Sequence, residues 1–269
     1  MRILHVLLLA ILTFCWIWSL PLLILGVLFA IPAAIVIFPV CICISSYMQY
    51  KYQGMCISNH WLRRVVSSIP WNEWFPCNTL AFKDGIIAVH PHGLLCCGTL
   101  AGIHFVPQSK TCMCIAPIVF YVPVIGWIAR LLGCIPADKY NMTRAIELGY
   151  PLLVVPGGVP EIVLVELADD TMRFKRHGFL KIANNTNSNV HIVFVNGECN
   201  TFTMFKAPFH SWRVWLSWKL NVPITLPIML GWYGTWIPKR QRLALHYKTV
   251  DGKISKKDYN IALEELYKK

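Results

Sequence analysis

Charged residues are scarce in this chain, and acidic residues are the scarcest of them. Only 14% of the 269 residues are charged, and Asp and Glu together number thirteen, whereas about 25% of residues are charged in ordinary soluble domains. Hydrophobic residues make up 56% of the sequence. This balance argues against a typical water-soluble domain and indicates a membrane-associated protein with a sizeable core.

No Asp, Glu, Lys or Arg occurs from Ile3 to Ser45. A single helix of this length would measure about 64 Å, twice the hydrocarbon core of about 30 Å, and prolines and a glycine interrupt its middle. We therefore predict a transmembrane helical hairpin over residues 1–50, followed by a membrane-associated domain over residues 51–269. Basic residues flank the run on both sides, so both of its ends should lie in the cytosol. One long tilted span and a cleavable signal peptide are the alternatives.

The chain is strongly basic, with a formal net charge of +12. Positive proteins often bind nucleic acids or anionic surfaces. The basic residues are not combined with a recognisable nucleic-acid-binding motif. Anionic lipid headgroups or a phosphorylated substrate therefore fit better, and we expect no nucleic-acid partner.

The eleven cysteines indicate neither a disulfide framework nor a metal site. Their number is odd and several lie in apolar runs, as expected for free thiols in a reducing cytosol. Cys96-Cys97 and Cys112-x-Cys114 lie near a pair of histidines, but they lack the C-x-x-C spacing that is usual for zinc. We therefore predict no metal site.

From Ile86 onwards, strand and helix patterns alternate, which is typical of an α/β sheet with flanking helices. Strands are predicted at residues 86–89, 114–120, 152–155, 190–195 and 242–250, and helices at 124–132, 143–148, 177–183 and 255–269. Asn141 or Thr143 is the expected N-cap of the second helix, and Ser255 that of the last.

Two later stretches are expected to face lipid. Residues 208–220 place Trp212, Trp215 and Trp218 three positions apart with basic residues between them, a pattern typical of an interfacial amphipathic helix, although a buried aromatic helix is the alternative. Residues 220–237 are apolar but contain prolines, so we expect an apolar wall for an acyl chain rather than a membrane span.

The most informative segment is His90-Pro91-His92-Gly93. It follows the buried strand at residues 86–89, Pro91 stiffens the turn, and Gly93 permits a tight exit. The turn presents an imidazole at the carboxyl end of a strand, where ligands usually bind in open α/β sheets. A histidine in this position can also form only local hydrogen bonds.

Two glutamates follow other predicted strands in the same way. Glu161 comes three residues after Gly157-Gly158, and Glu198 lies in Asn196-Gly197-Glu198. If these strands are neighbours of the one before His92, the three side chains converge on one edge of the sheet. A carboxylate there can orient an imidazole and stabilise its protonated form, although either glutamate taken alone could be a solvated loop residue.

Five segments in order resemble the type-2 diacylglycerol acyltransferase family, which also includes monoacylglycerol and wax-alcohol acyltransferases. The resemblance covers residues from about Gly85 to about Asn200. The segments are His90-Pro91-His92-Gly93, Pro123 to Lys139, Val155-Pro156-Gly157-Gly158-Val159-Pro160-Glu161, Lys175-Arg176-His177-Gly178-Phe179-Leu180-Lys181 and Phe194-Val195-Asn196-Gly197-Glu198.

The chain departs from the family at several points. Lys139 stands where Arg is common, Asn196 replaces an aromatic residue, and the later Gly-Arg-Gly and Gly-x-Pro-Ile segments have no clear match. The wider glycerolipid acyltransferases use His-x-x-x-x-Asp, whereas Leu95 and Cys97 lie five positions after His90 and His92. A lysophosphatidate-type enzyme is therefore disfavoured.

The resemblance implies an acyltransferase-type mixed sheet that transfers a fatty acyl group from acyl-coenzyme A to the hydroxyl of a neutral lipid, with no cofactor. Because an imidazole can take a proton from a hydroxyl, we expect His92 to be the base, His90 to assist and Glu161 to orient the base. The expected substrate-binding residues are Pro91, Gly93, Lys139, Gly157, Gly158, Arg176, Gly178, Lys181 and Glu198.

Within this set, Lys139, Arg176 and Lys181 are expected to bind the coenzyme A phosphates, with a solvated basic face as the alternative. The glycine turns are expected to donate N–H groups to the oxyanion. The resemblance also implies a multi-pass protein of the endoplasmic reticulum membrane, with lipid droplets as a second location. The main alternative function is that of a non-catalytic lipid-binding membrane protein. The sequence leaves open whether the chain forms a homo-oligomer.

Overall fold

The computed structural model describes residues 39–41, 43–44, 47, 51, 60–106, 110–122, 124–158, 161–162, 176–204, 208–220, 229–235 and 237–268. Nearly all of the predicted hairpin over residues 1–50 and half of the predicted apolar wall at 220–237 lie outside these residues. Among the helices of the described part, none is both long and apolar enough to cross a bilayer.

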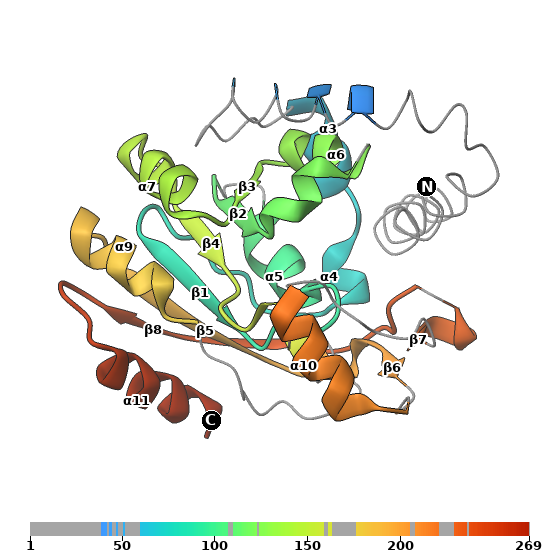
Figure 1. The fold of residues 1–269 in the computed structure, drawn as a ribbon. Coiled ribbons are helices and arrows are strands. Elements are labelled where there is room, and N and C mark those ends of the chain that lie inside the picture. Colours follow the sequence, from blue (N-terminus) through green and yellow to red (C-terminus); the bar gives the residue numbers. More distant parts are fainter. Residues whose placement is uncertain are drawn as a thin grey trace.

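A six-stranded sheet forms the centre of the described part, with the order β3-β2-β4-β1-β5-β8 (Figure 1). Its strands are β1 Ile86–His90, β2 Cys112–Ile115, β3 Cys134–Pro136, β4 Leu152–Val154, β5 Val190–Asn196 and β8 Ala244–Val250. The first five pair in parallel, and β8 is antiparallel to β5. The prediction of a mixed α/β sheet is confirmed.

Helices cover both faces of this sheet (Figure 1). One face packs against α7 Lys139–Glu147, α9 Gly178–Thr186 and α11 Lys256–Tyr267. The other packs against α3 His60–Ser67, α4 Trp71–Trp74 and α5 Cys97–Thr99, which continues as a π-helix over Leu100–His104. Because side chains alternate along a strand, Ile86 and Ala88 of β1 enter the first core, and Ile87 and Val89 enter the second.

Shorter elements complete the described part. The 3-10 helix Pro117–Tyr121 and α6 Ile125–Leu131 lie between β2 and β3. Beyond β5 come the 3-10 turns Glu198–Thr201 and Trp232–Gly234, the small pair of β6 Thr203–Met204 with β7 Met229–Leu230, and the separate helix α10 His210–Leu220.

Two local predictions differ from the structure. The strand predicted at 114–120 stops at Ile115, and a 3-10 helix begins at Pro117, because proline has no N–H for a strand ladder. The helix predicted at 143–148 begins at Lys139, and its N-cap is Asp138, whose carboxylate accepts from the Asn141 N–H at 2.9 Å. The expected cap of the last helix is confirmed, since the Ser255 hydroxyl accepts from the Asp258 N–H.

A side chain of α9 fixes the loop that leads into α11. The Asn184 amide accepts from the Ile254 N–H at 3.0 Å and donates to the Ile254 carbonyl at 3.1 Å. Ile254 is itself buried, so its backbone groups have little access to water. This pair of bonds sets where α11 starts and therefore where its first turn lies against the sheet.

We predict that Asn184→Ala lowers the free energy of unfolding by about 1–3 kcal/mol, because it leaves the buried N–H and carbonyl of Ile254 without partners. The neighbouring Asn185 is exposed, and Asn185→Ala should change stability by less than about 0.5 kcal/mol. Denaturant unfolding of the two variants in detergent measures the difference. Equal stabilities would show that the Asn184 contact does not hold α11.

Candidate active site

Three strand ends meet at one edge of the sheet. β1 lies between β4 and β5, with Ile86 opposite Leu152 on one side and His90 opposite Phe194 on the other. All three strands run in parallel, so the turns that follow them emerge together. The sequence left open whether these strands are neighbours; the structure shows that they are, which brings the turns bearing His92, Glu161 and Glu198 to one edge.

His90 is the last residue of β1 and is fully buried. The strand alternation directs its ring to the same face as Ile86 and Ala88, toward α11. Its Nε2 lies 2.6 Å from the hydroxyl oxygen of Tyr259 in the first turn of that helix. Pro91, also buried, follows through a cis peptide bond.

The imidazole of His92 is held in one tautomer. Its Nδ1 lies 2.9 Å from the carbonyl oxygen of Gly93, and a carbonyl can only accept, so Nδ1 carries a proton and Nε2 keeps its lone pair when the ring is neutral. Burial lowers the pKa of His92 below its ordinary value, although the hydrogen bond to Gly93 opposes the shift. The ring is therefore neutral at physiological pH, the form that can accept a proton at Nε2.

The thiol of Cys96 lies against this ring. Its Sγ is 3.5 Å from His92 Nδ1 and 3.9 Å from Nε2, and the S–H donates to the His92 carbonyl at 3.2 Å. The residue is buried, and its φ of +52° is uncommon outside glycine. Burial, followed by the charges of Glu198 and Glu161, raises the pKa of Cys96 well above its ordinary value, so the sulfur stays a thiol.

Glu161 contacts the backbone of His92 rather than its ring. Its Oε2 accepts from the His92 N–H at 3.0 Å, whereas the Gly93 carbonyl orients the imidazole. This differs from the direct carboxylate–imidazole contact expected from the sequence. A side chain at Gly157 would overlap the Glu161 carboxyl carbon, which explains the glycine there. Burial raises the pKa of Glu161 to about 7, although the bond from His92 opposes the shift.

Glu198 binds the start of α5. Its Oε1 accepts from the Cys97 N–H at 2.6 Å, and its Oε2 accepts from the Gly98 N–H at 2.8 Å. The side chain is fully buried. A Cβ at Gly93 would lie 2.5 Å from Glu198 Cγ, and one at Gly98 would lie 3.0 Å from Oε2. Glu198 thus joins the turn after β5 to the turn after β1, and its role as a substrate-binding residue stays a prediction.

Some N–H groups of the glycine turns already have acceptors. Those of Cys97 and Gly98 donate to Glu198, and that of Gly158 donates to the Val155 carbonyl at 3.2 Å. These three amides are not available to an oxyanion in this conformation. Any oxyanion donors in the turns would therefore be other backbone N–H groups.

The three predicted phosphate-binding residues lie near the same edge. Each parallel strand returns through a helix, so α7 and α9 both begin where the strands end, with Lys139 as the first residue of α7 and Lys181 in the first turn of α9. Both side chains are exposed. Arg176 is exposed too, and its guanidinium would lie 3.8 Å from a Cβ at Gly158. The first residue of α9, Gly178, has open space where a Cβ would be.

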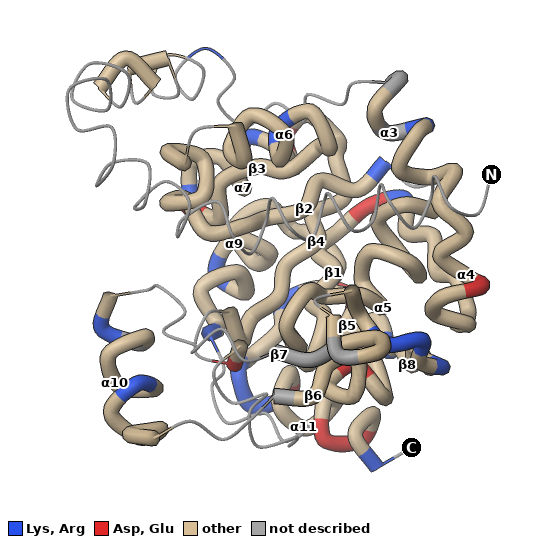
Figure 2. Tube along the Cα trace, turned by 90° about the vertical axis from the view of Figure 1, so that its right-hand side faces the viewer, with Lys and Arg blue, Asp and Glu red and all other residues tan. Residues whose placement is uncertain are grey.

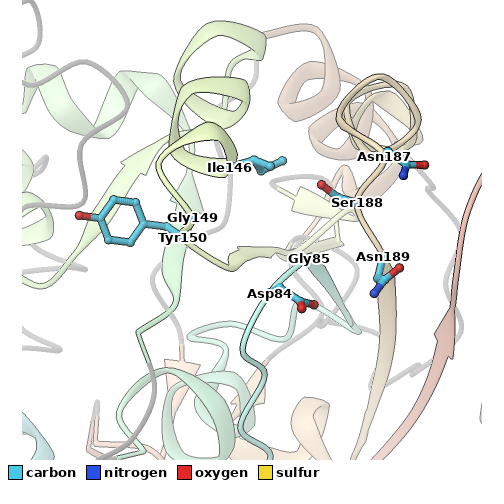
Figure 3. A pocket seen from close by; sticks show the side chains of 8 residues that line it. All are labelled: Asp84, Gly85, Ile146, Gly149, Tyr150, Asn187, Ser188 and Asn189. Carbon is cyan, nitrogen blue, oxygen red and sulfur yellow. The ribbon is translucent and has the colours of Figure 1, made fainter.

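Two hollows of the described surface lie away from this edge. One of about 280 Å³ is lined by residues at the opposite, amino-terminal ends of the strands, including Asp84, Tyr150 and Asn189 (Figure 3). Another of about 460 Å³ lies beside Phe82 and Tyr247. Neither hollow is lined by His90, His92, Glu161 or Glu198. The candidate site is therefore identified by the side chains that meet at the strand ends and not by a cavity. No group of three or more His, Cys, Asp or Glu is arranged for a metal ion within the described residues.

Sequence patterns did not reveal one contact and one backbone conformation at this site. Tyr259 lies 169 positions after His90, and its place in an amphipathic helix indicates burial but not a partner. The αL conformation of Cys96 gives no signal in a single sequence, since cysteine rarely adopts it.

Comparison with known proteins adds a family. The family model described as diacylglycerol acyltransferase matches residues 27–244. Diacylglycerol O-acyltransferase 1 of Eremothecium gossypii is 25% identical over 160 residues, which cover 54% of this chain and 34% of that protein. 2-Acylglycerol O-acyltransferase 3 of Homo sapiens is 22% identical over 145 residues, which cover 49% and 42%.

The match therefore spans between about a third and a half of the length of the curated relatives. Among solved structures, the 1-acyl-sn-glycerophosphate acyltransferase of Thermotoga maritima aligns over 92% of this chain and 93% of its own, with a TM-score of 0.46 and 16% sequence identity.

We predict that Glu161→Gln reduces the pH dependence of stability. The folded pKa of about 7 lies above the ordinary value of 4.5, so the stabilising contribution of the protonated carboxyl is full below about pH 4.5 and is lost as pH rises through about 7. At 1.36 kcal/mol per unit, the wild type should lose roughly 3 kcal/mol over this window relative to the variant.

Denaturant unfolding at about pH 5 and about pH 8 measures this loss. Glu147 is exposed and pairs with Arg144 at 3.5 Å, so Glu147→Gln is the matched control and should follow the wild type. The same pH slope in Glu161→Gln and wild type would contradict the raised pKa.

Proposed function

Because the chain belongs to the diacylglycerol acyltransferase family, we propose that it transfers a fatty acyl group from acyl-coenzyme A to the hydroxyl of a neutral lipid. Diacylglycerol is the preferred acceptor and triacylglycerol the product. Transfer to a monoacylglycerol or a wax alcohol is the alternative, and non-catalytic lipid binding is a further one. The observation that carries the proposal is the neutral imidazole of His92, with Nε2 as an acceptor at the edge where three strands end.

His92 is the proposed general base. An alcohol is a poor nucleophile, and an imidazole that takes its proton during attack typically accelerates transfer by about 10²–10⁴-fold. The hydroxyl oxygen bonds to the thioester carbonyl carbon, the carbon–sulfur bond breaks, and the proton accepted by Nε2 passes to the departing sulfur. The lowered pKa of His92 favours the first step because it keeps the ring unprotonated before attack.

The neighbouring residues position the base. Glu161 holds the backbone N–H of His92, and Glu198 holds the helix that follows the turn. Tyr259 holds the His90 ring from the side of α11. Within the described part of the chain, the His92 ring contacts the Gly93 carbonyl and the Cys96 thiol, so we assign these three residues to positioning and the proton transfer to His92.

In this proposal the coenzyme binds basic side chains at the protein surface, whereas the acceptor and the acyl chain enter from the membrane. The basic side chains Lys139, Arg176 and Lys181 lie near the strand ends and are exposed, as phosphate-binding groups of a solvated coenzyme must be. The acceptor and the acyl chain are apolar and come from a membrane. We place the enzyme at the endoplasmic reticulum membrane with its sheet on the cytosolic side, which agrees with the net charge of +12.

Detergent-purified protein and labelled oleoyl-coenzyme A test the activity and the acceptor together. The panel contains diacylglycerol, monoacylglycerol, a fatty alcohol and lysophosphatidate, and the proposal expects label mainly in triacylglycerol. Transfer only to lysophosphatidate would overturn the neutral-lipid assignment. No transfer to any acceptor by folded protein would favour lipid binding without catalysis.

We predict that His92→Ala lowers the turnover rate by at least about 10²-fold, because a general base is removed. His90→Ala should cost less, and Glu161→Gln should lie between the two, because these residues position the base. The measurement is transfer from labelled acyl-coenzyme A to diacylglycerol in microsomes at matched protein levels. Coenzyme A binding should survive in all three variants, and near wild-type transfer by His92→Ala would exclude the mechanism.

Removal of the hydroxyl of Tyr259 tests the positioning of His90. Tyr259→Phe keeps the ring packed on Phe179 and His177 but removes the hydrogen bond to His90, a loss of about 1 kcal/mol. We expect turnover to fall by about fivefold, with little change in KM for acyl-coenzyme A. Tyr267 is partly exposed, so Tyr267→Phe is the control. Equal turnover of the two variants would contradict the role of Tyr259.

A further inference from the structure

Helix α10, His210–Leu220, buries two polar side chains and exposes two tryptophans. Arg213 and Ser217 are buried, with exposed fractions of 4% and 0%. The exposed fractions of the large apolar side chains at and just before the helix are 78% for Phe209, 57% for Trp212, 54% for Trp215 and 55% for Leu220. A surface helix of a water-soluble protein has the reverse arrangement.

These four exposed apolar residues are here called the α10 stripe. Trp212 and Trp215 are three positions apart and share a face of the helix, whereas Phe209 comes just before its first turn and Leu220 is its last residue. Single exposed apolar residues are ordinary on protein surfaces, but a contiguous apolar stripe usually marks an interaction site.

The charged groups of α10 are placed as they are at a membrane interface. The ammonium of Lys219 lies 5.0 Å from the ring centroid of Trp215, so the cation and the indole share one surface. The Arg213 Nε–H donates to the Pro208 carbonyl at 3.0 Å, and this second cation is buried. Indole rings beside lysine are typical of the headgroup region, where one end of the side chain is apolar and the other is wet.

The position of α10 leaves its outer face accessible. In Figure 2 the helix lies at one side of the described part, apart from the sheet, with two basic positions along it. The same helix lies in front of the sheet in Figure 1. The two views together place α10 on the outside of the molecule.

We infer that the α10 stripe lies in the interface of a lipid bilayer. Phe209, Trp212, Trp215 and Leu220 would then lie at the boundary between the headgroups and the acyl chains. A bilayer suits this face better than a second copy of the chain for two reasons. The uncharged run from Ile3 to Ser45 is predicted from the sequence to enter a membrane, and the net charge of +12 attracts anionic headgroups. The inference concerns attachment alone and does not depend on acyl transfer.

Photo-crosslinking in the full-length chain tests this inference. The photoreactive residue p-benzoylphenylalanine replaces Trp212 or Trp215, one at a time, and the protein is reconstituted in vesicles of labelled phosphatidylcholine and phosphatidylserine. Tyr140 in α7 and Tyr247 in β8 are similarly exposed, at 60% and 53%, and the same replacement at each is the matched control. All four positions are on the surface, so folding should be preserved.

Irradiation should produce several-fold more lipid adducts at positions 212 and 215 than at 140 and 247. Equal lipid labelling at all four positions would overturn the inference, and so would crosslinks from 212 to a second copy of the chain in place of lipid. A second measurement uses vesicles without phosphatidylserine, in which the adduct yield at 212 should fall relative to that at 247. Crosslinking does not depend on acyl transfer. A protein that forms lipid adducts but transfers no acyl group would therefore contradict the proposed activity and leave the inference about α10 intact.

Discussion

One buried carboxylate and two backbone N–H groups fix the geometry on which the site depends. Glu198 has no exposed surface, and each of its oxygens accepts a bond from the start of α5. A buried charge without such partners would be very costly. The Glu198 side chain also leaves no room for a side chain at Gly93 or Gly98. Glu198, which follows β5, therefore fixes the path of the turn that carries His92.

Burial then sets the protonation of the groups held in this turn. The pKa of His92 falls and that of Glu161 rises, because desolvation disfavours the charged form of each. Both shifts favour the uncharged forms at neutral pH. The same burial keeps the imidazole unprotonated while the thiol of Cys96 beside it stays protonated.

Local sequence signals predicted the strands and turns but not the contacts across the molecule. The apolar run before His90 and the glycines near Glu161 and Glu198 sufficed to predict three strands, but the sequence left open whether they are neighbours, which the sheet order decides. The three-residue strand β3 is too short to give a pattern. The backbone bond of Glu161 and the hydroxyl of Tyr259 could not be predicted, since both depend on how separate segments pack in space.

The contact between Tyr259 and His90 has a consequence for biosynthesis. The two residues are 169 positions apart, and chains are made at about 5–20 residues per second. The strand that carries His90 therefore leaves the ribosome roughly ten to thirty seconds before α11 can reach it. During this interval the uncharged run near the amino terminus has already been synthesised, so its predicted entry into a membrane could precede completion of the site.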